Sequence, residues 1–255
     1  MSQPGTLSSD APSGPGRSLH APGPLALVGG AEWSEGCEVF DAALLEASGS
    51  AEVVVLPTAA AYTHPERAVE TATAYFSKLG AGVKACMVLR RGDAEDHGLA
   101  GQVRAARFIY LAGGSVLHLR SVLKASPVWD ALVEAWAGGT VVAASSAGAM
   151  VLGDTMVDPR GGALTLGLAL LAPLAVLPHA GDWSEEKTHR TVRLASGALR
   201  IAAVEERTAL IRDSGGHWRC LGAGEVTVWV GGRPGSLDDL QGVVPTVLAR
   251  PAPTD

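Results

Sequence analysis

The chain has 255 residues, of which 47% are hydrophobic, so it is long and apolar enough to bury a substantial core. Its formal net charge of -6 at pH 7, without a cluster of Lys and Arg that could neutralise phosphates, argues against nonspecific nucleic-acid binding. No run of about 18 or more apolar residues is present to span a bilayer, so we expect neither a nucleic-acid nor a membrane partner.

The first 23 residues are rich in Pro, Gly and Ser and lack the hydrophobic segment of a secretory signal. We therefore expect residues 1–23 to form a disordered tail.

Cys37, Cys86 and Cys220 lie far apart and lack the spacing of metal ligands, which favours reduced thiols. Reduced thiols indicate a cytoplasmic protein.

After the tail, apolar runs alternate with helical segments. Strands are expected at Leu25–Gly30, Glu52–Thr58, Val83–Leu89, Arg107–Gly114 and Thr140–Ser145. Helices are expected around Cys37–Ala47, Pro65–Leu79, Val116–Lys124 and Val128–Trp136. Continuous apolar strands separated by helices are typical of a parallel sheet that is buried on both faces. With right-handed crossovers this pattern predicts a three-layer, doubly wound α/β fold.

The later part of the chain has a different pattern. Leu164–Leu177 is apolar but interrupted by Gly167 and Pro173, and we interpret it as buried connections. Arg207–Gly232 alternates short strands with glycine-containing turns, which predicts a C-terminal antiparallel extension of the sheet. No repeat or linker divides the sequence, so residues 24–250 are expected to form a single α/β domain.

The stretch "VVAASSAGAM" at residues 141–150 passes from an apolar strand into a run of small residues. It fits the strand, nucleophile, helix pattern small-x-Ser-x-Gly when the pattern is centred on Ser146, with Ala144 and Gly148 as the small residues. Ala147 would then begin a helix, and its amide would face developing negative charge. Gly113-Gly114 could supply a second backbone amide donor to this charge. The alternative is a tight turn that serves packing only.

A serine nucleophile needs a base and a carboxylate that orients the base. His179 directly follows an apolar, strand-like run, so we expect it at a strand end, as the base. For the acid we favour Asp158, in the loop after the proposed elbow helix, over Asp154 at the end of that helix, and Glu206 is the third choice.

Four segments in this order resemble the serine peptidase family of cyanophycinase and aspartyl dipeptidase (peptidase E): "YLAGG", "SSAGAM", "LGLALLAPLAVLPHAGDW" and "VEERTAL". The resemblance runs from Leu25 to Val230. It implies the class I glutamine amidotransferase-like, flavodoxin-like fold. It also implies acyl transfer to water by a triad of Ser146, His179 and Asp158, with Gly114 and Ala147 as the oxyanion hole.

The resemblance further implies a small peptide or amide as substrate. We expect no cofactor, and no metal because no set of His, Asp and Glu residues has the spacing of metal ligands. The oligomeric state is left open, with a homodimer as one option. Because family members cut beside an aspartyl residue, a carboxylate clamp is expected. Gly113, Ser115, Arg190 and Arg193 are the candidate substrate-binding residues. Ser115 and Val116 stand where members carry Asn or Asp followed by Gln, so the side chain that the substrate must carry is left open. The choice between endo- and exo-cleavage is left open as well.

Two other functions fit parts of the pattern. An α/β-hydrolase esterase would place its histidine near the chain end, which would make His217 the essential base. A non-catalytic, glutamine amidotransferase-like binding module would keep the fold without turnover, and the altered Ser115-Val116 pair favours it.

Overall fold

The computed structural model describes residues 21–158, 162–195 and 197–246, so almost all of the expected tail lies outside the described residues. The α-helices are α1 (Glu38–Ser48), α2 (Pro65–Lys78), α3 (Arg91–Ala94), α4 (His97–Ala105), α5 (Val116–Leu123), α6 (Pro127–Ala137), α7 (Ala147–Leu152) and α8 (Glu185–Leu194). Three 3-10 helices are η1 (Thr58–Ala60), η2 (Ala180–Asp182) and η3 (Leu237–Gly242).

The main sheet has seven strands in the order β12-β11-β1-β5-β4-β2-β3. Its strands are β1 (Leu25–Val28), β2 (Glu52–Leu56), β3 (Gly82–Ala85), β4 (Phe108–Leu111), β5 (Val141–Ser145), β11 (Thr208–Arg212) and β12 (Trp218–Gly222). The five strands from β1 to β3 in this order run parallel, and β11 and β12 are antiparallel to their neighbours. The predicted mostly parallel α/β sheet is therefore confirmed.

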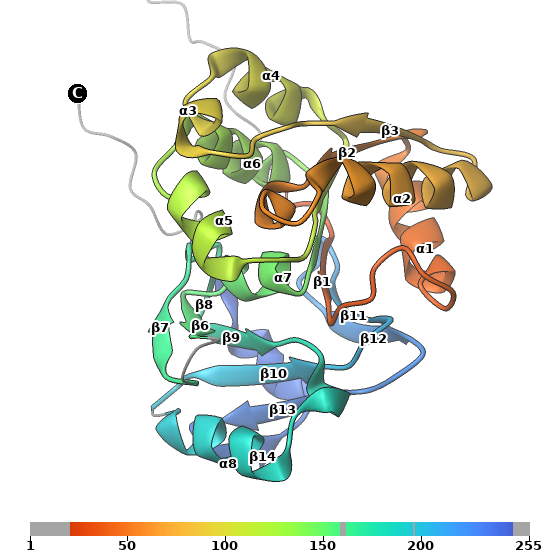
Figure 1. Cartoon of the computed structure of the whole chain (residues 1–255). Coiled ribbons are helices and arrows are strands. Elements are labelled where there is room, and N and C mark those ends of the chain that lie inside the picture. Colours follow the sequence, from red (N-terminus) through yellow and green to blue (C-terminus); the bar gives the residue numbers. More distant parts are fainter. Residues whose placement is uncertain (1–20, 159–161, 196, 247–255) are drawn as a thin grey trace, which may run out of the picture.

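Alternate residues of the central strands face two separate cores. In β1, Leu25 and Leu27 belong to the core covered by α4, α5, α6 and α7, whereas Ala26 and Val28 belong to the core covered by α1 and α2. Because both faces of the sheet are covered, its central strands β1, β4 and β5 are apolar along almost their whole length, with Ser145 at the end of β5 as the exception. Figure 1 shows the three layers, with α1 and α2 apart from α4, α5 and α6.

A second sheet of four strands has the order β14-β13-β10-β9. Its strands are β9 (Leu174–Leu177), β10 (Arg200–Val204), β13 (Val226–Val230) and β14 (Arg233–Gly235), and Figure 1 shows α8 beside them. Two small ladders join β6 (Thr155–Val157) to β7 (Leu164–Leu166) and β8 (Leu171–Ala172) to β15 (Val244–Pro245).

The second sheet and the two small ladders correct two expectations. Leu164–Leu177 contains β7, β8 and β9 rather than connections alone. The sequence did not predict these as separate strands because each has only two to four residues, too few for a periodic pattern. The C-terminal extension adds β11 and β12 to the main sheet as expected, but β13 pairs with β10 in the second sheet. The single domain over residues 24–250 stays a prediction.

Over the described ranges, no helix combines the length and the apolar character that crossing a bilayer requires. Cys37, Cys86 and Cys220 are all unpaired thiols.

Candidate active site

The carboxyl end of β1 holds three distant segments of the chain together. The carbonyl of Val28 accepts from the Ser146 amide at 2.9 Å, and the next carbonyl, of Gly29, accepts from the His179 amide at 2.7 Å. The carbonyl of Gly30 accepts from the Arg207 amide at 2.9 Å. Three consecutive carbonyls therefore hold the backbone of Ser146, of His179 and of Arg207, the residue next to Glu206, at the end of β1. The strand ends of an open α/β sheet are where ligands bind.

Ser146 occupies the sharp corner that the sequence predicts. β5 ends at Ser145, α7 begins at Ala147, and Ser146 between them has φ 49° and ψ -107°, a strained conformation for a residue with a Cβ. Gly148 lets α7 lie close to β4, since a Cβ there would stand 2.8 Å from the Leu111 carbonyl oxygen. The corner presents the Ser146 side chain at the end of the sheet.

His179 lies directly above the glycine turn after β1. A Cβ on Gly30 would be 2.2 Å from Cε1 of the His179 ring, so the absence of a side chain at Gly30 makes room for the imidazole. Nε2 of His179 is 2.9 Å from Oγ of Ser146. The structure thus brings the predicted serine and histidine into hydrogen-bonding contact.

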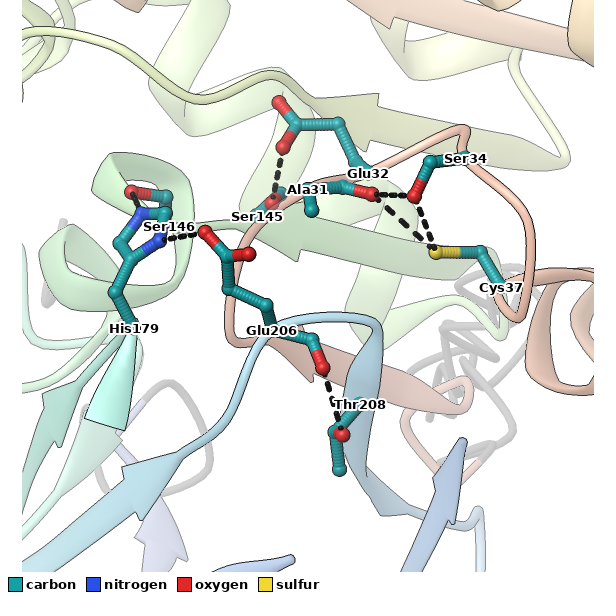
Figure 2. Close-up of polar contacts among 9 residues, drawn as sticks. All are labelled: Ala31, Glu32, Ser34, Cys37, Ser145, Ser146, His179, Glu206 and Thr208. Carbon is teal, nitrogen blue, oxygen red and sulfur yellow. Dashed lines mark hydrogen bonds and ion pairs between the residues drawn. The ribbon is translucent and has the colours of Figure 1, made fainter. Parts of the chain in front are cut away.

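The carboxylate at the other ring nitrogen is Glu206, whereas the sequence favoured Asp158. Oε1 of Glu206 is 2.8 Å from Nδ1 of His179, and Figure 2 shows both side chains. A neutral imidazole with its proton on Nδ1 satisfies both hydrogen bonds, donating to Glu206 and accepting from the Ser146 hydroxyl. Asp154 accepts from the Leu174 amide at 2.8 Å and so holds the first residue of β9.

The reason for this difference is the pairing of β9 with β10. These strands are parallel, with Leu177 opposite Ala203, so the residues that follow them emerge at the same edge. His179 follows β9 and Glu206 follows β10. The sequence does hold a signal for Glu206, since it comes just after an apolar strand run in the way that His179 does. The pairing of β9 with β10 joins segments that are distant in the sequence, so no local sequence pattern predicts it.

Two backbone amides lie beside Ser146 as the expected oxyanion donors. Ala147 is the first residue of α7, so its amide has no acceptor inside the helix. Gly114, after β4, has φ 138°, which favours glycine, and a Cβ there would be 2.3 Å from the Ala59 carbonyl oxygen. The described residues give the Gly114 amide no hydrogen-bond partner.

A cavity of about 430 Å³ opens at Ser146 and His179. Gly114, Ser115, Ala147 and Asp158 belong to its lining, and the remaining lining side chains are Val116, Leu117, Met150, Val157, Pro178, Trp183 and Lys187. The wall is therefore mostly apolar, with one carboxylate and one ammonium group among the described residues.

The other predicted substrate-binding residues lie outside this lining. Arg190 and Arg193 are exposed on α8, and the cationic side chain that α8 contributes to the cavity is Lys187. The Lys187 ammonium lies 3.8 Å from the centre of the Trp183 ring, a cation–π contact. Gly113 directs its amide away from the cavity, to Glu32.

Donor atoms of His179, Asp182 and Glu206 lie within 4.8 Å of one another and could in principle hold a metal ion. Both ring nitrogens of His179 are already hydrogen-bonded, to Ser146 and to Glu206. A metal bound through Nδ1 of His179 would have to displace the contact with Glu206.

Comparison with known proteins gives a consistent result. A family model described as Peptidase family S51 matches residues 25–218. Two cyanophycinases, from Synechococcus elongatus and from Thermosynechococcus vestitus, are each 29% identical over 150 residues, or 54% of this chain and 46% of the relative. The matched part thus spans about half the length of these curated relatives.

Two solved structures resemble the fold. A peptidase from an acI-B1 Actinobacterium has a TM-score of 0.74 and 26% identity, over 84% of this chain and 92% of that one. A putative peptidase E from Listeria monocytogenes has a TM-score of 0.55 and 19% identity, over 82% of this chain and 99% of that one, and supports the fold alone.

Proposed function

We propose, because the chain belongs to peptidase family S51 and is therefore a serine-type peptidase, that Ser146, His179 and Glu206 form its catalytic triad. The observation that carries the proposal is the unbroken hydrogen-bond chain from Ser146 Oγ to His179 Nε2 at 2.9 Å and from His179 Nδ1 to Glu206 Oε1 at 2.8 Å. Nucleophile, base and orienting acid each have the partner that acyl transfer needs.

In the first half of the reaction, Ser146 Oγ attacks the carbonyl carbon of the substrate while His179 Nε2 accepts its proton. Glu206 stabilises the imidazolium and holds the tautomer. His179 then gives the proton to the leaving amine, and the C–N bond breaks to leave an acyl-enzyme on Ser146. In the second half, water takes the place of the amine and His179 acts again as base and acid.

The negative charge of the tetrahedral intermediate develops on the former carbonyl oxygen. We propose that the amides of Gly114 and Ala147 donate to this oxygen. Support comes from the position of both residues in the cavity lining beside Ser146, and from the position of Ala147 at a helix N-terminus.

The substrate we propose is a small peptide or amide whose acyl part lies on the apolar wall of Val116, Met150 and Val157. A free carboxylate on the substrate would reach Lys187 in preference to Arg190 or Arg193, which are not in the lining. Cyanophycin-like substrates belong in the test set because of the two relatives, although the matched part covers only 46% of each.

The test is a library of short peptides and amides, screened against the wild-type protein and Ser146→Ala in parallel. Each peptide is offered both with a free C-terminal carboxylate and as the amide, so that a role for Lys187 shows as a preference for the acid. We expect turnover by the wild type and a loss on the order of 10⁶-fold in Ser146→Ala, because the triad acts as a unit. Equal turnover by both proteins would refute the proposal.

A further inference from the structure

We infer that Glu32 is a positioning residue for the proposed reaction, because its carboxylate ties the oxyanion loop, Gly113–Ser115, to the nucleophile corner at Ser145 and Ser146. The inference rests on the proposed function of Ser146. Glu32 lies in the segment between β1 and α1, and 113 residues separate it from Ser145.

Each oxygen of the Glu32 carboxylate has its own partner. Oε1 accepts from the Gly113 amide at 2.8 Å, and Oε2 accepts from the Ser145 hydroxyl at 2.7 Å. Figure 2 shows Glu32 extending to Ser145 on the side of the corner away from His179. One side chain thereby joins the segment after β4 to the last residue of β5. Hydrogen bonds to an ionised carboxylate are stronger than those between neutral groups.

The backbone around Glu32 is held in an unusual shape. Ala31 has φ 52° and Trp33 has φ 61°, conformations that residues with a Cβ rarely adopt. The Ala31 carbonyl accepts from the Ser34 hydroxyl at 2.6 Å, and the buried Trp33 ring packs on Tyr110 with ring centres 5.1 Å apart. The segment is therefore fixed on both sides of Glu32, in the conformation that brings its carboxylate to the corner.

Holding Gly113 determines where the neighbouring Gly114 amide lies. Ser115 donates its amide to the Ala59 carbonyl at 2.8 Å, so the oxyanion loop is anchored at Gly113 by Glu32 and at Ser115 by Ala59. The amide between these anchors, that of Gly114, is the one without a partner among the described residues. The anchors leave this donor available for the oxyanion and fix its position.

The loop also lies very close to the nucleophile. A Cβ on Gly113 would stand 3.3 Å from the Cβ of Ser146, so a movement of Gly113 changes the distance between the donor and the reacting atoms. A displacement of about 1 Å at a reacting centre can cost about 100-fold in rate. Glu32 itself is not among the residues that line the cavity, and the carboxylate at His179 is Glu206. Its effect is exerted through Gly113 and Ser145.

The experiment measures the phosphonylation of Ser146 by an alkyl fluorophosphonate, with the maximal rate kinact and the half-saturating concentration KI determined separately. We expect Glu32→Ala to lower kinact about 100-fold with KI unchanged, because only the geometry of the transition state is affected. Glu32→Gln should stay within about 10-fold of wild type. Its amide can still accept from the Gly113 amide and donate to the Ser145 hydroxyl.

Two further variants complete the set. Ser145→Ala removes one of the two contacts and should lower kinact about 10-fold. Glu35→Ala, an exposed residue of the same segment, should match wild type. Wild-type kinact in both Glu32→Ala and Ser145→Ala overturns the inference, as does an equal fall in Glu32→Ala and Glu32→Gln. If Glu32→Ala does not fold, Ser145→Ala decides. A wild-type protein that is not labelled on Ser146 overturns the proposed function and this inference with it.

Discussion

Two adjacent serines at the end of β5 have different surroundings. Ser146 contacts His179 and lines the cavity, whereas Ser145 is fully buried and donates to Glu32. The sequence pattern already distinguishes them, because Ala144 and Gly148 flank Ser146 at the spacing that a sharp corner needs. It contains nothing about Glu32, because the contact depends on how the segment after β1 folds back over β5.

A direct test distinguishes Glu206 from Asp158 as the acid of the proposed triad. Glu206→Gln presents an amide to Nδ1 of His179, which favours the wrong tautomer and removes the charge that stabilises the imidazolium. We expect turnover of a substrate from the library to fall on the order of 10⁴-fold.

The matched control is Asp158→Asn, in the cavity lining. We expect Asp158→Asn to lower turnover far less than Glu206→Gln does. Its effect should be a change in KM. A loss in Asp158→Asn as large as that in Glu206→Gln would instead return the role of the acid to Asp158.

At the scale of elements, the nucleophile corner depends on how closely α7 approaches β4. A Cβ at Gly148 would be 2.8 Å from the Leu111 carbonyl oxygen and 3.0 Å from the Leu111 Cβ. Leu111 is fully buried and belongs to the central strand β4, so it has little freedom to move away.

Gly148→Ala should therefore lower the free energy of unfolding by about 1–3 kcal/mol, through overpacking. Urea denaturation measures the change. Gly101→Ala, in the middle of α4 with open space around it, is the control and should raise stability by up to about 1 kcal/mol through helix propensity. A gain in stability from Gly148→Ala would show that the corner is less tightly packed than the structure indicates.

The elements that the sequence predicts well are those with long local patterns. The apolar runs of β1, β2, β4 and β5 and the helices α1, α2, α5 and α6 lie within a few residues of their expected bounds. The short strands β6, β7 and β8 have two or three residues each, too few for a periodic signal. The pairing of β9 with β10, which brings Glu206 to His179, depends on the whole fold.

At the scale of the whole molecule, the core beneath α1 and α2 contains an ionisable group. Asp41, on α1, is completely buried, and removal from water raises the pKa of its carboxyl to about 8. The nearby Tyr75 hydroxyl partly opposes this rise, and the negative charges of Glu38 and Glu32 add to it. The native state thus holds this proton far more tightly than the unfolded chain does.

The consequence is a dependence of stability on pH. Because the folded pKa is raised, the stability from this proton is fully present below about pH 4, the unfolded value, and is lost as pH rises to about 8. Between these limits the free energy of unfolding should fall by up to about 1.4 kcal/mol per pH unit.

Asp41→Asn removes this proton equilibrium while keeping the shape of the side chain. Urea denaturation at pH 5 and pH 8 should show a smaller decline in stability for Asp41→Asn than for wild type. Parallel declines in the two proteins would show that Asp41 does not titrate in this interval.

Ser146 as the reacting nucleophile is the premise of both the proposed reaction and the role of Glu32. Its most direct measurement is the mass of the folded protein after treatment with a fluorophosphonate, followed by peptide mapping. We predict one adduct on wild type, located at Ser146, and none on Ser146→Ala. A wild-type protein that stays unmodified, or an adduct that persists in Ser146→Ala, would contradict it.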